Sequence, residues 1–285
     1  MASILSSYRP TKRKPTAFIS TVVVASVLTV ICCKPYTNLA HAQSTASPDN
    51  DSKQRAAWQE AVAAAKQAKY QLAVKHANAA IAAGLNHPTV FYLRGRWNFR
   101  IDEVQASLND FDRFLELAPQ RSNSLWERGI TCYYAKAYQA GARQFVDYQE
   151  YHDNDVENAV WRYLCQLQFD GKPKAQASIL PIPNDSRVPM MEVYRLFKGE
   201  LTPQDVLDAL QAKGTEGVQG KHEKFDAHLY LGLYFDSEND LKSAMKHTDL
   251  AVAQFKQGDY MWAVAVEHQK SLKRRMEREK SKTNE

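Results

Sequence analysis

Histidine and cysteine, the side chains that most often bind metals or attack substrates, are sparse here, with eight histidines and four cysteines in 285 residues. His222 and His228 are six residues apart, which does not place both on one helix face, and His152 and His247 are isolated. No HExxH sequence or paired-cysteine ligand spacing occurs, so we predict no metal site and no cofactor. The GxSxG, GxGxxG and phosphate-loop patterns are also missing, and we therefore expect no enzyme.

The residues suited to recognition are large aromatic side chains that return at a fixed interval. Trp58, Tyr92 and Trp126 follow one another at intervals of 34 residues. Tryptophan, tyrosine and arginine supply much of the binding energy at protein interfaces. The spacing therefore predicts a groove with an aromatic anchor in every repeat, where a protein or peptide would bind.

The interval of 34 residues belongs to a repeat that must position these rings. A small residue lies three places after each ring, at Ala61, Gly95 and Gly129, and a further window has one at Gly232. Another small residue follows each of them by twelve places. This pattern is typical of the tetratricopeptide repeat (TPR), a pair of antiparallel helices that cross closely at the small residues. We expect an all-α chain whose pairs stack into a right-handed superhelical TPR solenoid.

In such a solenoid the first helix of each pair lines the inner groove, at positions three before, one after and four after the small residue. In the first repeat these positions are Trp58, Val62 and Ala65. The predicted binding residues of the groove are Trp58, Tyr92, Arg96, Phe99, Trp126, Ile130 and Tyr133. The alternative is that some of these rings pack between repeats as core.

Arg94 and Arg128 lie directly before two of the small residues and form a second repeated pair. They could bind a carboxylate of a partner, because the guanidinium group matches a carboxylate in geometry. The alternative is a structural ion pair with Asp110, Glu127 or Asp147 of the chain itself.

The period also divides the chain into segments. Residues 43–53 are polar and small and predict a flexible linker. Thr202 followed by Pro203 predicts the start of a short helix inside an off-period helical insert. Within an array spanning 54–258 we expect repeats at 54–86, 87–120 and 121–154, a degenerate repeat at 155–180, the insert at 181–221 and a last repeat at 222–255. Residues 259–285 then form a C-terminal capping helix with a charged tail.

The first 42 residues have the features of a secretory signal peptide. A basic stretch from Arg9 to Lys14 precedes an apolar run at 17–33 and the small-residue site Ala40-His41-Ala42. We expect export to the periplasm or cell envelope, with cleavage after Ala42. The alternative is that residues 17–33 stay as a membrane anchor, because this run is at the lower length limit for a span. Membrane contact is expected only through this segment.

The formal net charge of +5 lies in that same segment. Residues 1–42 hold five basic residues and no acid, so residues 43–285 hold 32 of each kind. A nucleic-acid binder needs a basic footprint on its folded domain, and we therefore predict no nucleic-acid partner. The tail at 269–285 remains basic, which the dipole at a helix C-terminus favours; the alternative is contact with an anionic surface.

Two cysteines, Cys132 and Cys165, lie beyond the predicted cleavage site, on helices of adjacent repeats. Export would allow a disulfide, but Cα atoms on neighbouring helices are often too far apart to be bridged. We predict that both are buried as small hydrophobic residues.

Beyond the repeat itself, the chain resembles the NlpI-type TPR proteins of the bacterial envelope over roughly residues 54–270. The segments that carry this resemblance are 125–145, 159–168, 192–212 and 226–252, of which the middle two are the more specific. The resemblance implies a non-enzymatic adaptor that forms a homodimer and docks periplasmic proteases and cell-wall hydrolases. Those proteins are anchored through a lipid-modified cysteine that follows a small residue, whereas here Ile31 precedes Cys32. A module that binds cell-wall glycan on its aromatic stripe is the alternative function.

Overall fold

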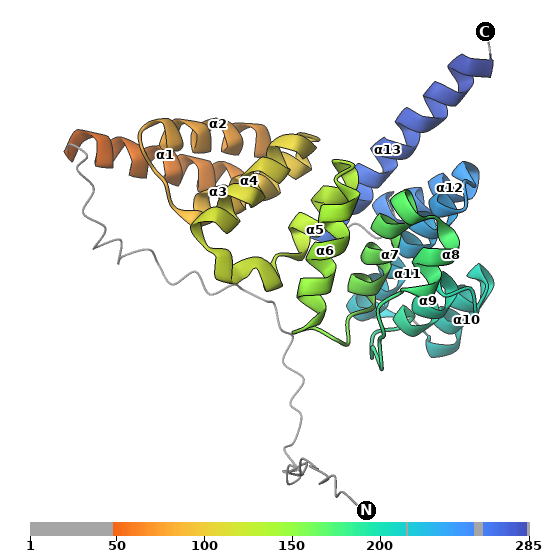
Figure 1. Ribbon diagram of the computed structural model, residues 1–285. Coiled ribbons are helices and arrows are strands. Elements are labelled where there is room, and N and C mark those ends of the chain that lie inside the picture. The colour runs from red at the N-terminus through yellow and green to blue at the C-terminus, as the bar shows by residue number, and fades with distance from the viewer. Residues whose placement is uncertain (1–47, 215, 254–258, 284–285) are drawn as a thin grey trace, which may run out of the picture. The chain divides into compact units, whose positions relative to one another are not determined.

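The described part of the chain is helical throughout, as predicted. The computed structural model describes residues 48–214, 216–253 and 259–283, and within these ranges it contains 13 α-helices, one 3-10 helix and no strand (Figure 1). In chain order the helices are α1 (Pro48–Lys66), α2 (Tyr70–Ala82), α3 (Pro88–Arg100), α4 (Val104–Leu117), η1 (Pro119–Ser124), α5 (Trp126–Tyr134), α6 (Tyr138–Gln149), α7 (Val156–Asp170), α8 (Lys172–Ala177), α9 (Met190–Phe197), α10 (Pro203–Lys213), α11 (Gly217–Ser237), α12 (Leu241–Ala253) and α13 (Tyr260–Thr283).

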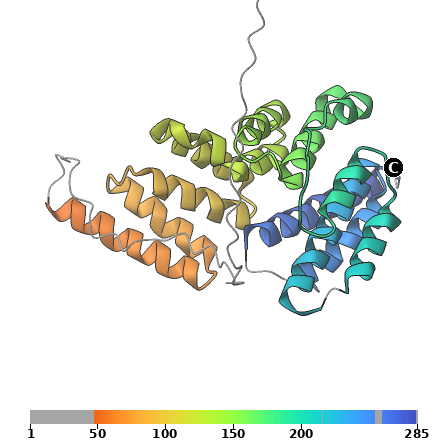
Figure 2. The same cartoon turned by 90° about the horizontal axis from the view of Figure 1, so that it is seen from below.

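Consecutive helices pack against each other in pairs. α1 packs with α2, α3 with α4, α5 with α6 and α11 with α12, so each pair lies in a window that the 34-residue period predicts. The second helix of one pair also contacts the first helix of the next, as α2 does with α3, and Figure 2 shows the early pairs side by side. This arrangement is consistent with a helical repeat, in which each pair covers the apolar face of its neighbour.

The small residues of the repeat lie where the two helices of a pair approach closely. A Cβ atom added to Gly129 would lie 2.5 Å from Cζ of Phe145, closer than side-chain atoms can approach. At Gly95 the same atom would lie 3.2 Å from the ring of Phe111. A larger residue at either position would therefore push the helix axes apart, which explains the spacing seen in the sequence.

The turn inside each of these pairs also repeats. Among the described residues, the non-glycine residues with a left-handed backbone are Ala68, Asp102, Lys136 and Asn239, with φ between 56° and 69°. Each lies seven places after the small residue of its window. This conformation costs a residue with a side chain about 1–2 kcal/mol, so its recurrence reflects one shared turn geometry.

Replacing Ala68 with glycine should therefore stabilise the protein. Glycine removes the steric cost of the left-handed backbone but also gains entropy in the unfolded chain, leaving a net gain of roughly 0.5–1 kcal/mol. Ala83 is the matched control, because it has an ordinary φ of −77° at the end of α2 and should lose stability when replaced by glycine. Urea unfolding measures both variants, and equal losses for the two would contradict the prediction.

The first helix begins earlier than predicted. Residues 48–53 belong to α1, so the predicted linker over 43–53 is wrong there, and residues 43–47 lie outside the described ranges. Pro48 can open a helix because the first residue needs no N–H partner. Asp49 and Asp51 then face the positive end of the helix dipole, and Lys53 pairs with Asp49 at 2.7 Å.

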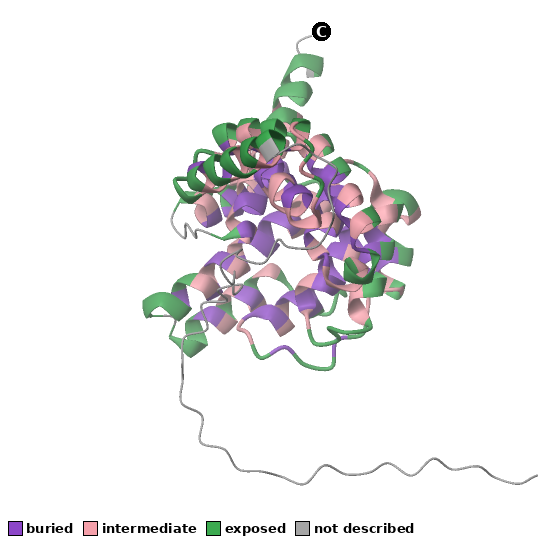
Figure 3. Cartoon of the chain, turned by 90° about the vertical axis from the view of Figure 1, so that its left-hand side faces the viewer, coloured by how far each residue is buried: buried purple, intermediate pink, exposed green. Residues whose placement is uncertain are grey.

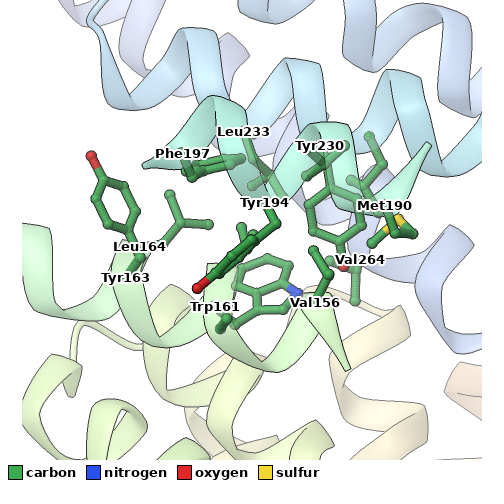
Figure 4. Close-up of a cluster of buried hydrophobic side chains, with 14 of the residues drawn as sticks. Val156, Trp161, Tyr163, Leu164, Met190, Tyr194, Phe197, Tyr230, Leu233 and Val264 are labelled. Carbon is green, nitrogen blue, oxygen red and sulfur yellow. The ribbon is translucent and has the colours of Figure 1, made fainter. Parts of the chain in front are cut away.

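A large apolar core joins α7, α9, α11 and α13 (Figure 4). Trp161, Tyr163, Phe197 and Tyr230 are each at most 1% exposed. Because α9 supplies part of this core, the off-period insert is an integral part of the fold. Its second helix, α10, begins at the predicted cap: the backbone N–H of Thr202 donates to the Asp205 carboxylate at 2.7 Å.

The C-terminal helix α13 packs against α12, α11 and α3, helices that are far apart in the sequence. Its first half is buried, with Tyr260 at 2% exposure and Leu272 at 0%, whereas its end is exposed (Figure 3). Arg274 near the middle of α13 donates to Asp102 in the turn after α3 at 2.9 Å. α13 is therefore fixed to the first half of the described chain as well as to the second.

None of the helices in the described ranges has an apolar stretch long enough to cross a membrane. The predicted signal peptide at 1–42, and with it the alternative of an anchor at 17–33, lies outside those ranges.

Candidate functional site

Trp58 lies apart from the other predicted groove residues. Its indole ring stacks on that of Trp97, with centroids 5.7 Å apart and planes inclined by 29°. Both rings belong to a small apolar cluster shared by α1, α2 and α3. Trp58 thus packs between the first two helix pairs, the alternative that the sequence left open.

Tyr92 and Arg96 are brought together around one buried carboxylate. The Tyr92 hydroxyl donates to Oε1 of Glu127 at 2.7 Å. Arg96 Nη1 donates to the Tyr92 hydroxyl oxygen and to Oε1 of Glu127, each at 2.7 Å. Glu127 is only 3% exposed. Burial and then the charge of Glu127 raise the pKa of Tyr92 to about 12, so its hydroxyl stays protonated. These groups satisfy one another and link α3 to α5.

Three of the predicted groove residues are covered by α13. The ring of Tyr260 stacks on Phe99 with centroids 5.3 Å apart and meets Trp126 edge-on at 5.4 Å. The guanidinium of Arg96 lies 4.8 Å from the centre of the same ring. The chain's own C-terminal helix therefore occupies this part of the predicted groove.

Phe99 and Ile130 are each 1% exposed and belong to the core. Phe99 cannot touch a partner while Tyr260 of α13 lies on it, whereas Ile130 lines a cavity beside Trp126. Trp126 and Tyr133 are partly exposed, and each lines a different cavity, as described below.

Arg94 and Arg128 are both held by side chains of the chain itself. Arg94 Nε donates to Asp110 at 2.9 Å, across the crossing of α3 and α4. Arg128 Nε donates to Asp112 at 2.7 Å, a partner that the sequence analysis did not name. Both guanidinium groups thus tie neighbouring helices together.

His247 is not isolated, contrary to the sequence prediction. Its Nδ1 lies 2.9 Å from Nδ1 of His228, and the ring of Phe235 stacks on it at 5.4 Å. Burial lowers the pKa of His228 to about 4, so both rings are neutral near pH 7 and one donates to the other. Among the residues that the structure describes, no three histidine, cysteine or acidic side chains gather as a metal site.

Cys132 and Cys165 are free and buried, in agreement with the prediction. Both flank Gly141, where an added Cβ would lie 2.8 Å from the sulfur of Cys165 and 3.1 Å from Cβ of Cys132. Burial raises the pKa of Cys132 to about 11, so the thiol is neutral and a poor nucleophile at ordinary pH.

A cavity of about 610 Å³ lies where α5, α6, α7, α11 and α13 meet. We name it the tyrosine cavity, after Tyr133, Tyr134 and Tyr138 in its wall. Lys136, Arg275, Arg278 and Lys282 also line it, against the acidic side chains of Asp236 and Glu279.

The charge of the tyrosine cavity is only partly balanced. Arg275 pairs with Asp236, whereas Lys136, Arg278 and Lys282 form no ion pair within the described ranges. Burial raises the pKa of Tyr133 and Tyr134, so their hydroxyls remain protonated and can donate hydrogen bonds. Basic groups beside tyrosine hydroxyls suit an anionic ligand such as a carboxylate.

A second cavity, of about 200 Å³, opens beside Trp126 and is named the Trp126 cavity. Its aromatic wall consists of Trp126 from α5, Phe145 and Tyr148 from α6, and Trp161 from α7. Its polar wall consists of Asp155, Glu157 and Asn158, at the start of α7. Burial and then the charge of Asp155 raise the pKa of Glu157 to about 6.

No protein-family model matches the sequence. The activity must therefore be inferred from the two cavities themselves. Each combines charged side chains of mainly one sign with aromatic rings, and tryptophan, tyrosine and arginine are enriched among the residues that contribute most to binding at protein interfaces.

Proposed function

We propose that this protein is a non-enzymatic scaffold of the bacterial cell envelope, of the TPR type, which docks partner proteins on its helical surface. The tyrosine cavity is the observation that carries the proposal. It is formed by helices from several parts of the chain, so it exists only in the folded protein. Its aromatic and basic wall would accept an acidic peptide segment.

The paired helices support this function because stacked pairs present extended surfaces to which partners bind. The signal-like N-terminus and the resemblance to NlpI-type adaptors support an envelope location. Envelope proteases and cell-wall hydrolases are the partners that this resemblance favours.

Capture of proteins from an envelope extract tests the proposal. We expect the immobilised protein to retain a small set of proteins, and the charge reversal Lys136→Glu with Arg278→Glu to release them. Lys66→Glu with Lys242→Glu is the matched control, because it changes the charge equally at exposed positions outside the cavity. Quantitative mass spectrometry of the retained proteins gives the comparison.

The same protein set on the cavity variant and on wild type would contradict the proposal. A different outcome would establish glycan binding instead. In that case the wild type and the control would bind isolated cell wall, and the cavity variant would lose this binding while its protein capture stayed unchanged. That alternative is kept because tyrosine rings also bind sugars.

A further inference from the structure

The Trp126 cavity has an excess of negative charge. Asp155 and Glu157 line it, and no basic side chain is among its described lining residues. Arg187 binds Asp155 at 2.8 Å and also Asp185 at 2.6 Å, and it approaches Glu157. Three carboxylates thus share one guanidinium group.

One carboxylate of the cavity is incompletely paired. Arg187 Nη1 lies 3.4 Å from Oε2 of Glu157, longer than the roughly 2.7–2.9 Å of a strong charge-assisted bond. The only other described bond to the Glu157 carboxylate comes from the Tyr230 hydroxyl at 2.8 Å. The site can therefore accept a further cation.

One deeply buried side chain that lines the cavity has an unused acceptor atom. Asn158 is 2% exposed, and while its amide nitrogen donates to Gln149, its Oδ1 has no partner in the described structure. The Nε1–H of Trp161 also has no partner there, but as a donor it needs an acceptor, which a guanidinium group does not supply. Buried polar atoms of this kind are normally satisfied, so they indicate that something polar occupies the cavity.

The size and the walls limit what this occupant can be. A volume of about 200 Å³ is below the roughly 300–1,000 Å³ of a typical cofactor or ligand pocket, so it suits a single side chain. The rings of Trp126, Tyr148 and Trp161 favour a cation that can stack on an aromatic face. Asn158 Oδ1 and the incompletely paired Glu157 carboxylate require N–H donors.

We propose that the Trp126 cavity binds an arginine side chain presented by a partner protein. A guanidinium group is planar, stacks on aromatic rings and has five N–H donors, which match the rings and the acceptor oxygens of this cavity. The proposal rests on the scaffold function and adds the residue by which the scaffold selects one of its partners. Because the tyrosine cavity is basic and this one is acidic, the chain recognises opposite charges at two places.

Titration of the full chain with N-acetyl-arginine methylamide tests the proposal. The matched probe is N-acetyl-citrulline methylamide, which has nearly the same shape but no charge. We expect tryptophan fluorescence and calorimetry at pH 7.5 to show at least tenfold weaker binding of the citrulline probe. Glu157→Gln and Asp155→Asn should each remove this preference, whereas Glu60→Gln, an exposed position on α1, should keep it.

Equal affinity for the two probes, or binding of neither, would overturn the proposal, as would an unchanged arginine preference in both cavity variants. Asp155→Asn guards against a folding defect, because asparagine caps α7 as well as aspartate does. The result is separable from the scaffold test. Failure here leaves capture through the tyrosine cavity unaffected, and failure of capture leaves arginine binding to be measured.

Discussion

Replacing Tyr260 with alanine should lower the free energy of unfolding by about 3–5 kcal/mol, the cost of removing a large buried aromatic side chain. Tyr260 is 2% exposed and its ring contacts Phe99, Trp126 and Arg96. It therefore fills the space between α13 and the helices of the second and third repeats. Alanine would leave a cavity between α13 and the rings of Phe99 and Trp126.

Urea unfolding followed by circular dichroism measures this effect. Tyr260→Phe is the control, because it keeps the ring and should change stability by less than about 1 kcal/mol. A loss below about 1 kcal/mol for the alanine variant would contradict the view that α13 is part of the folded core. The C-terminal helix would then be a removable cover over the groove.

Replacing Glu157 with glutamine should flatten the pH dependence of stability between pH 4.5 and 7. The pKa of Glu157 is about 6 in the folded protein against an ordinary value of 4.5, because burial and then Asp155 disfavour the ionised form. The folded chain therefore holds the proton more tightly, and stability falls as pH rises through this range. At about 1.36 kcal/mol per pKa unit the wild type loses about 2 kcal/mol that the variant does not lose.

Unfolding of both proteins at pH 4.5 and pH 7 checks this expectation. The variant should gain about 2 kcal/mol on the wild type between the two pH values. Both proteins keep the charged and titratable groups around Glu157: Asp155, Asp185, Arg187, Tyr148, Asp226 and Tyr230. The charge of Glu157 also raises the pKa of Asp226, so removing it lowers that pKa and acts in the same direction. A stability difference that is the same at both pH values would contradict the assignment of the raised pKa to Glu157.

The helix pairs could be predicted because their cause lies in local spacing. The repeat predicts that Gly95 and Gly129 lie where two helices cross closely. They do, since Phe111 and Phe145 leave no room for a Cβ atom at these positions. The helix start at Thr202 was also predictable, because a cap depends on neighbours in sequence. The recurring left-handed turn was not, because alanine at Ala68 and lysine at Lys136 do not indicate a positive φ.

The predicted groove was harder to judge, because its outcome depends on a helix far away in the sequence. The rings of Phe99 and Trp126 lie on the expected helices, yet Tyr260 of α13 covers them. Nothing in the repeat pattern indicates that α13 turns back onto α3. The arginines show a similar limit, since Arg128 pairs with Asp112 instead of one of the three acids considered from the sequence.

The two cavities also depend on tertiary packing. Tyr138 and Arg278 share the tyrosine cavity although 140 residues separate them. Trp161 lies 35 places after Trp126, one place off the repeat period, which was the only sequence signal for the second aromatic wall. Asp226 of α11 lies close enough to Glu157 for that charge to raise its pKa, a neighbourhood that could not be predicted before the fold was known.

The central claim is that partner proteins dock in the tyrosine cavity, and crosslinking from inside this cavity tests it most directly. A photoreactive phenylalanine analogue at Tyr138, in the chain expressed in its own cells, would report what lies against the cavity wall. We predict crosslinks to one or a few proteins, which disappear with Lys136→Glu and Arg278→Glu and persist when Lys66 and Lys242 are changed instead. Crosslinks that are absent, or that survive reversal of the cavity's charge, would contradict the claim.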